Sequence, residues 1–377
     1  MMQGLIEFLP TIRRIHHGHG IMAQALCDEL AAQGARKPLV LLARALLGTA
    51  VETRLRDVME DGLIHSTSFE EVPPAVVLEA ARVARDAEAD AVIAVGGGSA
   101  IDTAKGLRFA LASGVDDAQQ LLPAMSRPSP AKGWLPLVAV PTTLSGAEYT
   151  RSFSVNDRAA GQKRSHMGSG VSATAIVYDP TVTVATPEAL WVGTGFVALD
   201  HAIEVYVANA PHPVADALKA ESAATLLAKL ASSRHAEAET ARLDCFLAGW
   251  MADHSPLRTR STGGGATPWS HVLAYELAAL AGISYTVTAS LTLGNSLRLL
   301  AETRLGASRQ QQLAARLGLT QSLPDAVDDY ARALGMPTTP AEAGLSAAQL
   351  EAVAQACAAR ASLEVEKCRR VLGAGAV

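Results

Sequence analysis

The sequence predicts two domains: an α/β domain with a mostly parallel sheet, then an all-α helical bundle domain. In the first half, short apolar runs such as Pro38–Leu42 and Ala91–Val95 alternate with amphipathic helical stretches, the order typical of parallel sheets covered by helices. From Pro187 onward strand signals nearly vanish while helical spacing continues. A chain of 377 residues is also long for one domain. The predicted boundaries are 1–183 and 184–377.

Composition narrows the possible partners. Hydrophobic residues make up 49% of the chain and charged residues 18%, which excludes disorder and allows large cores. Aromatic residues are only 4% and the net charge is −5, so the chain lacks stacking platforms and the basic surface that nucleic acid or an anionic membrane requires. A small-molecule partner is expected.

Cysteine usage and the apolar segments bear on location. The four cysteines are scattered without a CxxC pair, which predicts reduced thiols in a cytoplasmic protein. Glu7 interrupts the short apolar opening, so no signal peptide is expected. The stretch Leu277–Leu297 carries no charge, but its Ser, Thr, Gly and Asn content favours a buried helix with a loop over a membrane span.

The opening segment contains a formal match to the G-x-G-x-x-G/A fingerprint at Gly18–Ala23. The preceding Thr11–Ile15 carries two arginines and is a poor buried strand, so we interpret the match as a structural turn. The histidines within and just before this turn are interpreted as solvated rather than metal-binding. A helix over Gly20–Ala32, ending near Gly34, and a strand over Pro38–Leu42 follow.

The stretch 91–106, AVIAVGGGSAIDTAKG, follows a helix predicted over residues 73–88. Ala91–Val95 is a buried strand, Gly96, Gly97 and Gly98 form a turn, and Ser99 with Asp102 forms a Ser-x-x-Asp helix start. Outward backbone amides, the helix dipole and the missing Cβ atoms together make an anion site that suits a pyrophosphate. The alternative is a tight turn with a capping box.

A second polar loop follows the next strand. After a loop over Pro123–Pro130, the apolar run Leu135–Val140 leads directly into PTTLSGAE. The hydroxyls of Thr142, Thr143 and Ser145 there suit contacts with a nucleotide, although such residues also cap turns. A further apolar run, Ala175–Tyr178, leads to Asp179-Pro180.

The run GGGSAIDTAKG resembles the phosphate-binding signature of the iron-dependent alcohol dehydrogenase and maleylacetate reductase superfamily, relatives of dehydroquinate synthase. The resemblance covers nearly the whole chain. It implies hydride transfer with NAD or NADP in a homodimer, with the active site in the cleft between the two domains. The short PTTLSGAE loop is similar to that of maleylacetate reductases. Lys163 stands where relatives direct a lysine into the cleft, toward a phosphate or a substrate carboxylate; the alternative is an exposed hairpin lysine.

The end of the Pro38–Leu42 strand bears on the choice between the two cofactors. Relatives often place there an acidic residue that bonds the adenosine ribose and rejects a 2′-phosphate. Here the acid is missing and Arg44 is adjacent, which favours tolerance of NADP. A solvated surface arginine is the alternative.

The resemblance also implies a metal site with four ligand positions. Two of these four positions do not hold the expected ligand in this chain. In metal-dependent relatives an aspartate and, four residues later, a histidine share a helix face; here these positions are Val197 and His201. The other two ligands are histidines fourteen positions apart, here His271 and Tyr285. Relatives often carry a further histidine four residues after the first of these two; that position is Tyr275 here.

A divalent metal usually needs at least three protein ligands, so we predict that no catalytic metal is bound. Asp200 is adjacent to His201 but should face away, since successive helical residues point about 100° apart.

The resulting hypothesis is an NAD(P)-dependent reductase of a small activated carbonyl compound, without a metal. His201 or His271 would act as general acid, and Tyr285 could donate its phenolic proton. The alternative for these three side chains is a structural role, with their polar groups hydrogen-bonded in the core. The alternatives for the chain are an enzyme with non-redox or transient-redox chemistry, and a catalytically silent protein that binds a nucleotide. The segment 261–268 is interpreted as a cleft loop that shapes a different substrate pocket.

Overall fold

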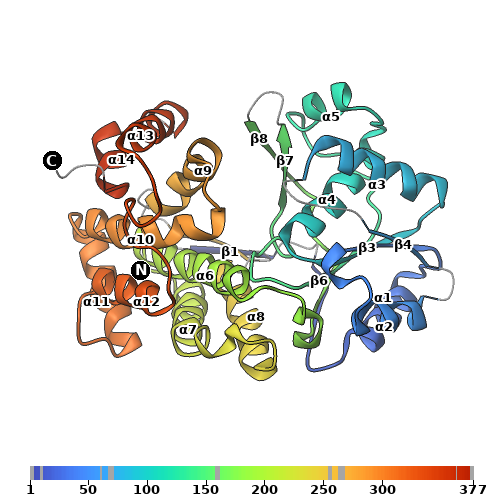
Figure 1. The fold of residues 1–377 in the computed structure, drawn as a ribbon, viewed down its shortest axis with the longest axis horizontal. Helices are drawn as coiled ribbons and strands as arrows, with labels where there is room; N and C mark the ends of the chain where they lie inside the picture. The colour runs from blue at the N-terminus through green and yellow to red at the C-terminus, as the bar shows by residue number, and fades with distance from the viewer. Residues whose placement is uncertain are drawn as a thin grey trace.

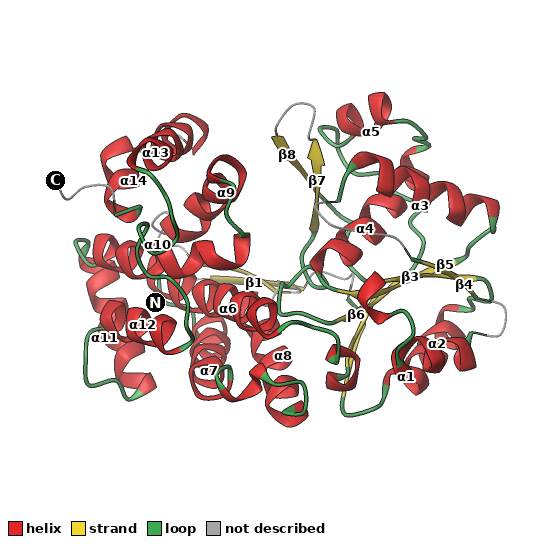
Figure 2. Cartoon of the chain, viewed as in Figure 1, coloured by secondary structure: helices red, strands yellow, loops and turns green. Residues whose placement is uncertain are grey.

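The computed structural model describes residues 4–8, 12–59, 62–66, 72–157, 162–253, 257–261, 268–361 and 363–373. It consists of an α/β part and a helical part, seen at the right and left of Figure 1. Figure 2 shows that the main-sheet strands lie in the α/β part, while helices dominate the other. The predicted fold class is confirmed.

A six-stranded, fully parallel sheet forms the centre of the α/β part. Its order is β2-β9-β6-β5-β3-β4, with bounds Arg14–His17 for β2, Pro38–Leu42 for β3, Leu63–His65 for β4, Ala91–Gly96 for β5, Leu137–Pro141 for β6 and Ala175–Tyr178 for β9. The helices of this part are α1 (Met22–Gln33), α2 (Ala50–Val58), α3 (Pro74–Asp86), α4 (Gly98–Ser113) and α5 (Ala118–Ala124).

Both faces of this sheet are buried, which explains the unbroken apolar runs. Leu39 and Leu41 of β3 pack into one hydrophobic core with α3 and α4. Val40 and Leu42, pointing the other way, pack into a second core with α1 and α2. The period-two alternation of a strand thus feeds two cores at once.

The edge strand β2 carries charge that the interior strands do not. Arg14 and His16 both bind the buried carboxylate of Glu29 on α1, at 2.8 Å (Nη2) and 2.7 Å (Nε2). Residues 12–15 form no interior strand, as expected; Arg14–His17 pairs with β9 at the edge of the sheet. The helix α1 ends as predicted, at Gly34 in the left-handed conformation (φ 68°).

An antiparallel hairpin, β7 (Ser152–Asp157) and β8 (Gln162–Met167), stands beside the main sheet. After β9 the chain enters the helical part, whose helices are α6 (Glu188–Ala208), α7 (Pro213–Lys229), α8 (Glu239–Asp253), α9 (Trp269–Ala281), α10 (Tyr285–Leu300), α11 (Arg304–Leu317), α12 (Leu323–Ala333), α13 (Ala347–Ala361) and α14 (Val365–Val371). Short 3₁₀ turns occupy Arg44–Leu46, Pro180–Thr183 and Ser232–Arg234.

The uncharged stretch Leu277–Leu297 forms two helices, α9 and α10, joined by a turn at Gly282 (φ 70°). The prediction of a buried helix with a loop is confirmed for α10 from Thr288 onward, whereas Leu280 near the end of α9 is exposed. Among the described residues, no helix combines the length and apolar character that crossing a membrane requires.

One strand interrupts the expected all-helical second half. β10 (Leu257–Ser261) pairs antiparallel with β1 (Gly4–Phe8), so the start of the chain joins a segment between α8 and α9. The sequence of β10, LRTRS, carries little apolar periodicity. Its strand conformation depends on a partner some 250 positions away in sequence, which local pattern does not reveal.

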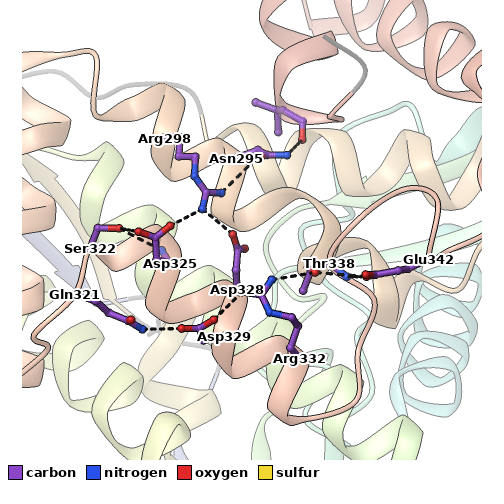
Figure 3. Close-up of polar contacts among 11 residues, drawn as sticks. Asn295, Arg298, Gln321, Ser322, Asp325, Asp328, Asp329, Arg332, Thr338 and Glu342 are labelled. Carbon is purple, nitrogen blue, oxygen red and sulfur yellow. Dashed lines mark hydrogen bonds and ion pairs between the residues drawn. The ribbon is translucent and has the colours of Figure 1, made fainter. Parts of the chain in front are cut away.

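A network of charged side chains links α10 to α12 (Figure 3). Arg298 on α10 reaches Asp325 and Asp328 of α12, each at 2.8 Å. Gly294 lies one turn before Arg298, and a Cβ there would stand 2.1 Å from Oδ1 of Asp328. The helices therefore approach closely because residue 294 has no side chain.

Gly294→Ala is expected to lower the free energy of unfolding by about 1–3 kcal/mol, because Asp328 must leave Arg298 to admit the methyl group. Gly249→Ala on α8 is the matched control: there the new Cβ meets only Leu144 Cδ2 at 3.8 Å. The control should gain about 0.5–1 kcal/mol from helix propensity. Urea unfolding of both variants gives the comparison, and equal effects would contradict the close-approach argument.

Candidate active site

The glycine turn joins β5 to α4 as predicted, but the helix begins differently. Gly97 is the N-cap residue and no side chain caps the helix. The predicted Ser-x-x-Asp capping box is therefore wrong: Ser99 lies inside the first turn, and Asp102 Oδ2 accepts from the Ser154 N–H at 3.1 Å. The extended backbone of Gly97 (φ −75°, ψ −174°) already occupies the cap position, and the first-turn amides have no side-chain cap.

The second loop packs directly on this turn and accounts for two of its glycines. A Cβ on Gly97 would stand 3.2 Å from Thr143 Cγ2, and one on Gly98 would stand 2.8 Å from Ser145 Oγ. The Thr142 N–H donates to the Gly96 carbonyl at 3.0 Å. The two predicted loops thus form one surface.

Two hydroxyls on this surface have no hydrogen-bond partner in the part of the chain that the structure describes. They are the buried oxygens Thr143 Oγ1 and Ser145 Oγ. A buried polar group left unsatisfied costs about 1–3 kcal/mol, and native structures rarely keep one without a reason. Unsatisfied hydroxyls beside uncapped helix amides fit the phosphates and sugar of a dinucleotide.

The other glycine-containing turn, Gly18–Ala23, does not offer such a site. The carboxylate of Asp179 accepts from the N–H groups of Gly20 and Met22, each at 2.9 Å, at the start of α1. The protein's own anion therefore occupies this helix N-terminus, which confirms the interpretation as a structural turn. His19 of this turn lies 3.0 Å from Glu239 of α8.

Arg44 is exposed in the 3₁₀ turn directly after β3. The preceding residue, Ala43, donates its N–H to the Val95 carbonyl at 2.9 Å and lies against Gly96. Arg44 thus follows the residue that packs on the glycine turn. Lys163 has its backbone in β8, but its side chain lies outside the described part of the chain, as does most of the predicted cleft loop over 261–268.

His201 of α6 and His271 of α9 are in direct contact. Nε2 of His201 lies 3.0 Å from Nδ1 of His271, and the rings meet edge to face, 4.8 Å apart at 72°. Both side chains keep some contact with solvent. The dense packing around His201, with His271 and Lys219 nearby, holds the pKa of His201 well below its usual value. His201 is accordingly neutral at pH 7.

Glu204, one turn after Asp200 on α6, fixes the helix that carries His271. Its carboxylate accepts from the backbone N–H groups of Ser270 (2.7 Å) and His271 (3.1 Å), and from the Ser296 hydroxyl. Since Pro268 gives α9 no side-chain cap, Glu204 supplies that cap from another helix. Burial raises the pKa of Glu204 to about 7.

Asp200 shares this buried environment. Burial and the neighbouring Glu204 raise its pKa well above the usual value, and its Oδ1 has no hydrogen-bond partner among the described residues. Asp200 interacts with Ser270 and so faces α9. Sequence reasoning overlooked Glu204, although its four-residue spacing from Asp200 was a readable signal.

Tyr285 lies at another level of the helical part. The hydroxyls of Ser270 on α9 and Thr292 on α10 are 2.7 Å apart, and Tyr285 precedes Thr292 by seven residues, about 10 Å along α10. Thr286 packs at Gly193, near the start of α6. The structure thus brings His201 and His271 together and places Tyr285 nearer the opposite end of α9.

The positions that the sequence resemblance assigns to the metal hold few side chains able to bind one. The aspartate position holds the buried, apolar Val197, and Glu204 binds the backbone of α9. Within the described ranges, no three His, Cys, Asp or Glu side chains are grouped as metal ligands. Two imidazoles are fewer donors than iron or zinc usually requires.

The second loop contacts the same face of α6 that carries His201. Thr194 accepts the Leu144 N–H of the second loop at 3.1 Å. His201 follows Thr194 by seven residues, two turns, and therefore lies on the same helix face about 10 Å further along. A cofactor that begins at the glycine turn and extends along α6 would reach the pair.

A glycine turn at the carboxyl end of a parallel sheet, next to a polar pair in a separate part, is typical of dehydrogenases with a dinucleotide cofactor. Two family profiles match the chain: iron-containing alcohol dehydrogenase over residues 12–180, and the C-terminal part of the Fe-containing alcohol dehydrogenase family over residues 191–370. The chain belongs to the iron-containing alcohol dehydrogenase family. It is an NAD(P)-dependent oxidoreductase of the dehydrogenase and reductase type.

Individual relatives agree with this assignment. Maleylacetate reductase 1 of Cupriavidus pinatubonensis is 27% identical over 341 residues, 88% of this chain and 84% of the relative. The maleylacetate reductase structure from Agrobacterium tumefaciens has a TM-score of 0.76 at 22% identity, covering 97% of this chain and 96% of the other. Sulfoacetaldehyde reductase from Bifidobacterium kashiwanohense, in complex with NAD+, has a TM-score of 0.79 at 24% identity, covering 94% and 92%. The structural likenesses establish a shared fold.

Proposed function

We propose that this oxidoreductase reduces a small activated carbonyl compound without a catalytic metal. The observation that carries the proposal is the hydrogen-bonded pair His201–His271, which stands at the family's metal position beside Val197. The likeness to maleylacetate reductase 1 of Cupriavidus pinatubonensis supports a reductase. With no Lewis acid to polarise it, the substrate carbonyl must be reactive through its own substituents.

The dinucleotide is held by the surface described above. The residues assigned to it are Gly96, Gly97, Gly98, Ser99, Asp102, Thr142, Thr143, Ser145 and Lys163. When bound, the reduced nicotinamide supplies the hydride. Arg44 beside the glycine turn and the missing acid after β3 favour acceptance of NADPH as well as NADH.

The histidine pair supplies the proton. As the carbonyl carbon gains the hydride, its oxygen becomes an alkoxide and takes a proton from a ring nitrogen outside the pair's own hydrogen bond, Nδ1 of His201 or Nε2 of His271. A neutral N–H in a preorganised site stabilises that developing charge. Solvent replaces the proton, since both rings are partly exposed.

Cofactor titration with a carbonyl panel tests the proposal. NADH and NADPH should both bind, seen as a change in nicotinamide fluorescence, and one or more activated aldehydes or keto acids should oxidise the cofactor at 340 nm. Activity should persist after EDTA dialysis, with substoichiometric iron and zinc by mass spectrometry. Binding without turnover would favour the transient-redox or silent alternatives.

Val197→Asp is the matched variant for the metal part of the proposal. It adds the missing carboxylate one turn before His201 and so completes three ligands. This variant should retain iron or zinc through dialysis where the parent protein does not. Stoichiometric metal in the parent, lost on replacing either His201 or His271, would contradict the metal-free mechanism.

We further propose a homodimer, on the family resemblance, and a cytoplasmic location, on the free cysteines Cys27, Cys245, Cys357 and Cys368. Light scattering of the purified protein measures the first.

A further inference from the structure

Lys105 is a buried lysine on α4, the helix that begins at the glycine turn. Its side chain is inaccessible to solvent. The ammonium donates to the Thr150 carbonyl (2.9 Å), the Thr150 hydroxyl (3.0 Å) and the Ser152 carbonyl (2.9 Å), and contacts the Ala147 carbonyl as well. Burying an ammonium is costly unless its three N–H groups are satisfied. Four oxygens from one short segment achieve that here.

The segment that Lys105 holds is the end of the second nucleotide loop. Ala147 and Thr150 lie two and five residues after Ser145, whose hydroxyl lies beside Gly98 and has no hydrogen-bond partner among the described residues. The start of the same loop is fixed by the Thr142 N–H on the Gly96 carbonyl, and its middle by the Leu144 N–H on Thr194. Lys105 is therefore the third anchor of this loop, and it ties the loop to α4, the helix that begins at the glycine turn.

We propose that Lys105 is a positioning residue for the dinucleotide. It sets the hydroxyls of Thr143 and Ser145 against the amides of the glycine turn, so that both loops meet the pyrophosphate together. This inference rests on the proposed nucleotide site and adds a residue that is inaccessible to the ligand. Its effect is preorganisation: an anchored loop has less conformational entropy to lose when the cofactor binds.

Arg108, one turn after Lys105, provides a matched comparison. It is also buried and also spends its donors on backbone carbonyls, those of Leu135 (2.6 Å), Gly170 (3.0 Å) and Val171 (3.0 Å) among them. These carbonyls precede β6 and β9, at the end of the sheet opposite the glycine turn. The two cations thus share a helix and a chemistry but hold different segments.

The experiment compares Lys105→Met with Arg108→Met, both folded by circular dichroism at the assay temperature. Both substitutions should lower the melting temperature. Lys105→Met should raise the Kd for NADH about tenfold, because the loop is no longer held; Arg108→Met should leave that Kd within about twofold. Thr150→Val, which removes one of the four oxygens, should raise the Kd less but in the same direction. It serves as the readout if Lys105→Met does not fold.

The outcomes separate this inference from the proposed function. If the parent protein binds neither NADH nor NADPH, the nucleotide site itself is wrong. If the parent binds and Lys105→Met binds equally well, only the positioning role is overturned. Equal losses of affinity in Lys105→Met and Arg108→Met would show a general effect of destabilisation and would also overturn it.

Discussion

Replacing His271 with alanine is expected to lower kcat about 10²- to 10⁴-fold while the Kd for NADH changes little. The ring lies 3.0 Å from His201 and belongs to the pair assigned as proton donor, and removing a general acid has an effect of that size. The assay is cofactor oxidation at 340 nm with the best carbonyl of the panel. His271→Gln retains polar groups but cannot exchange a proton in the same way, so its kcat should be similarly low.

His166→Ala is the control for loss of a buried histidine. His166 on β8 is buried and bonds the Met125 carbonyl (2.9 Å) and the Ser129 hydroxyl (2.7 Å), in the α/β part. Its replacement should lower stability and leave kcat nearly unchanged. An equal fall in kcat for His166→Ala and His271→Ala would refute the assigned role.

Because the pKa of His201 is depressed, protonation of His201 should not shape the kcat profile between pH 7 and 9.

Gly98→Ala is expected to weaken NADH binding about 10- to 100-fold. The new Cβ would lie 2.8 Å from Ser145 Oγ and 3.2 Å from Ser145 Cβ, so the second loop must move away from the helix N-terminus. Overpacking of this kind costs about 1–3 kcal/mol, and each 1.4 kcal/mol corresponds to about tenfold in affinity. Fluorescence titration measures the change.

Gly106→Ala tests whether overpacking α4 anywhere has that effect. Its Cβ would stand 3.0 Å from Val77 Cγ1, on the side of α4 that packs against α3. This variant should lose stability in urea unfolding yet bind NADH normally. Normal binding by Gly98→Ala would instead show that the second loop adapts without cost.

Much of the fold was readable because single segments encode it. Pro38–Leu42 is apolar throughout since both of its faces are buried, and Gly34 ends α1 because it adopts the left-handed conformation. The β1–β10 ribbon was not readable. Its pairing joins residues 4–8 to residues 257–261, some 250 positions apart, and the sequence of β10 carries little apolar periodicity.

The site divides in the same way. The glycine turn is a local feature, so the sequence indicated it, although Gly97 and not Ser99 became the cap. The meeting of His201 with His271 rests on the packing of α6 against α9, which only the family resemblance suggested. Glu204 and Lys105 act through backbone atoms of distant segments. No spacing within one helix states which carbonyl or amide such a side chain will reach.

The pairing of β1 with β10 has a mechanical consequence. β10 lies between α8 and α9, so its pairing joins β1 to the helical half. From β1 the chain continues into β2 of the main sheet, and it returns to the helical half from β9 into α6. The two halves are thus connected by two segments rather than one, which restricts the hinge rotations open to them. Residues 181–190 lie between the two family profiles. Cutting the chain there would leave β1 in one fragment and its partner strand β10 in the other.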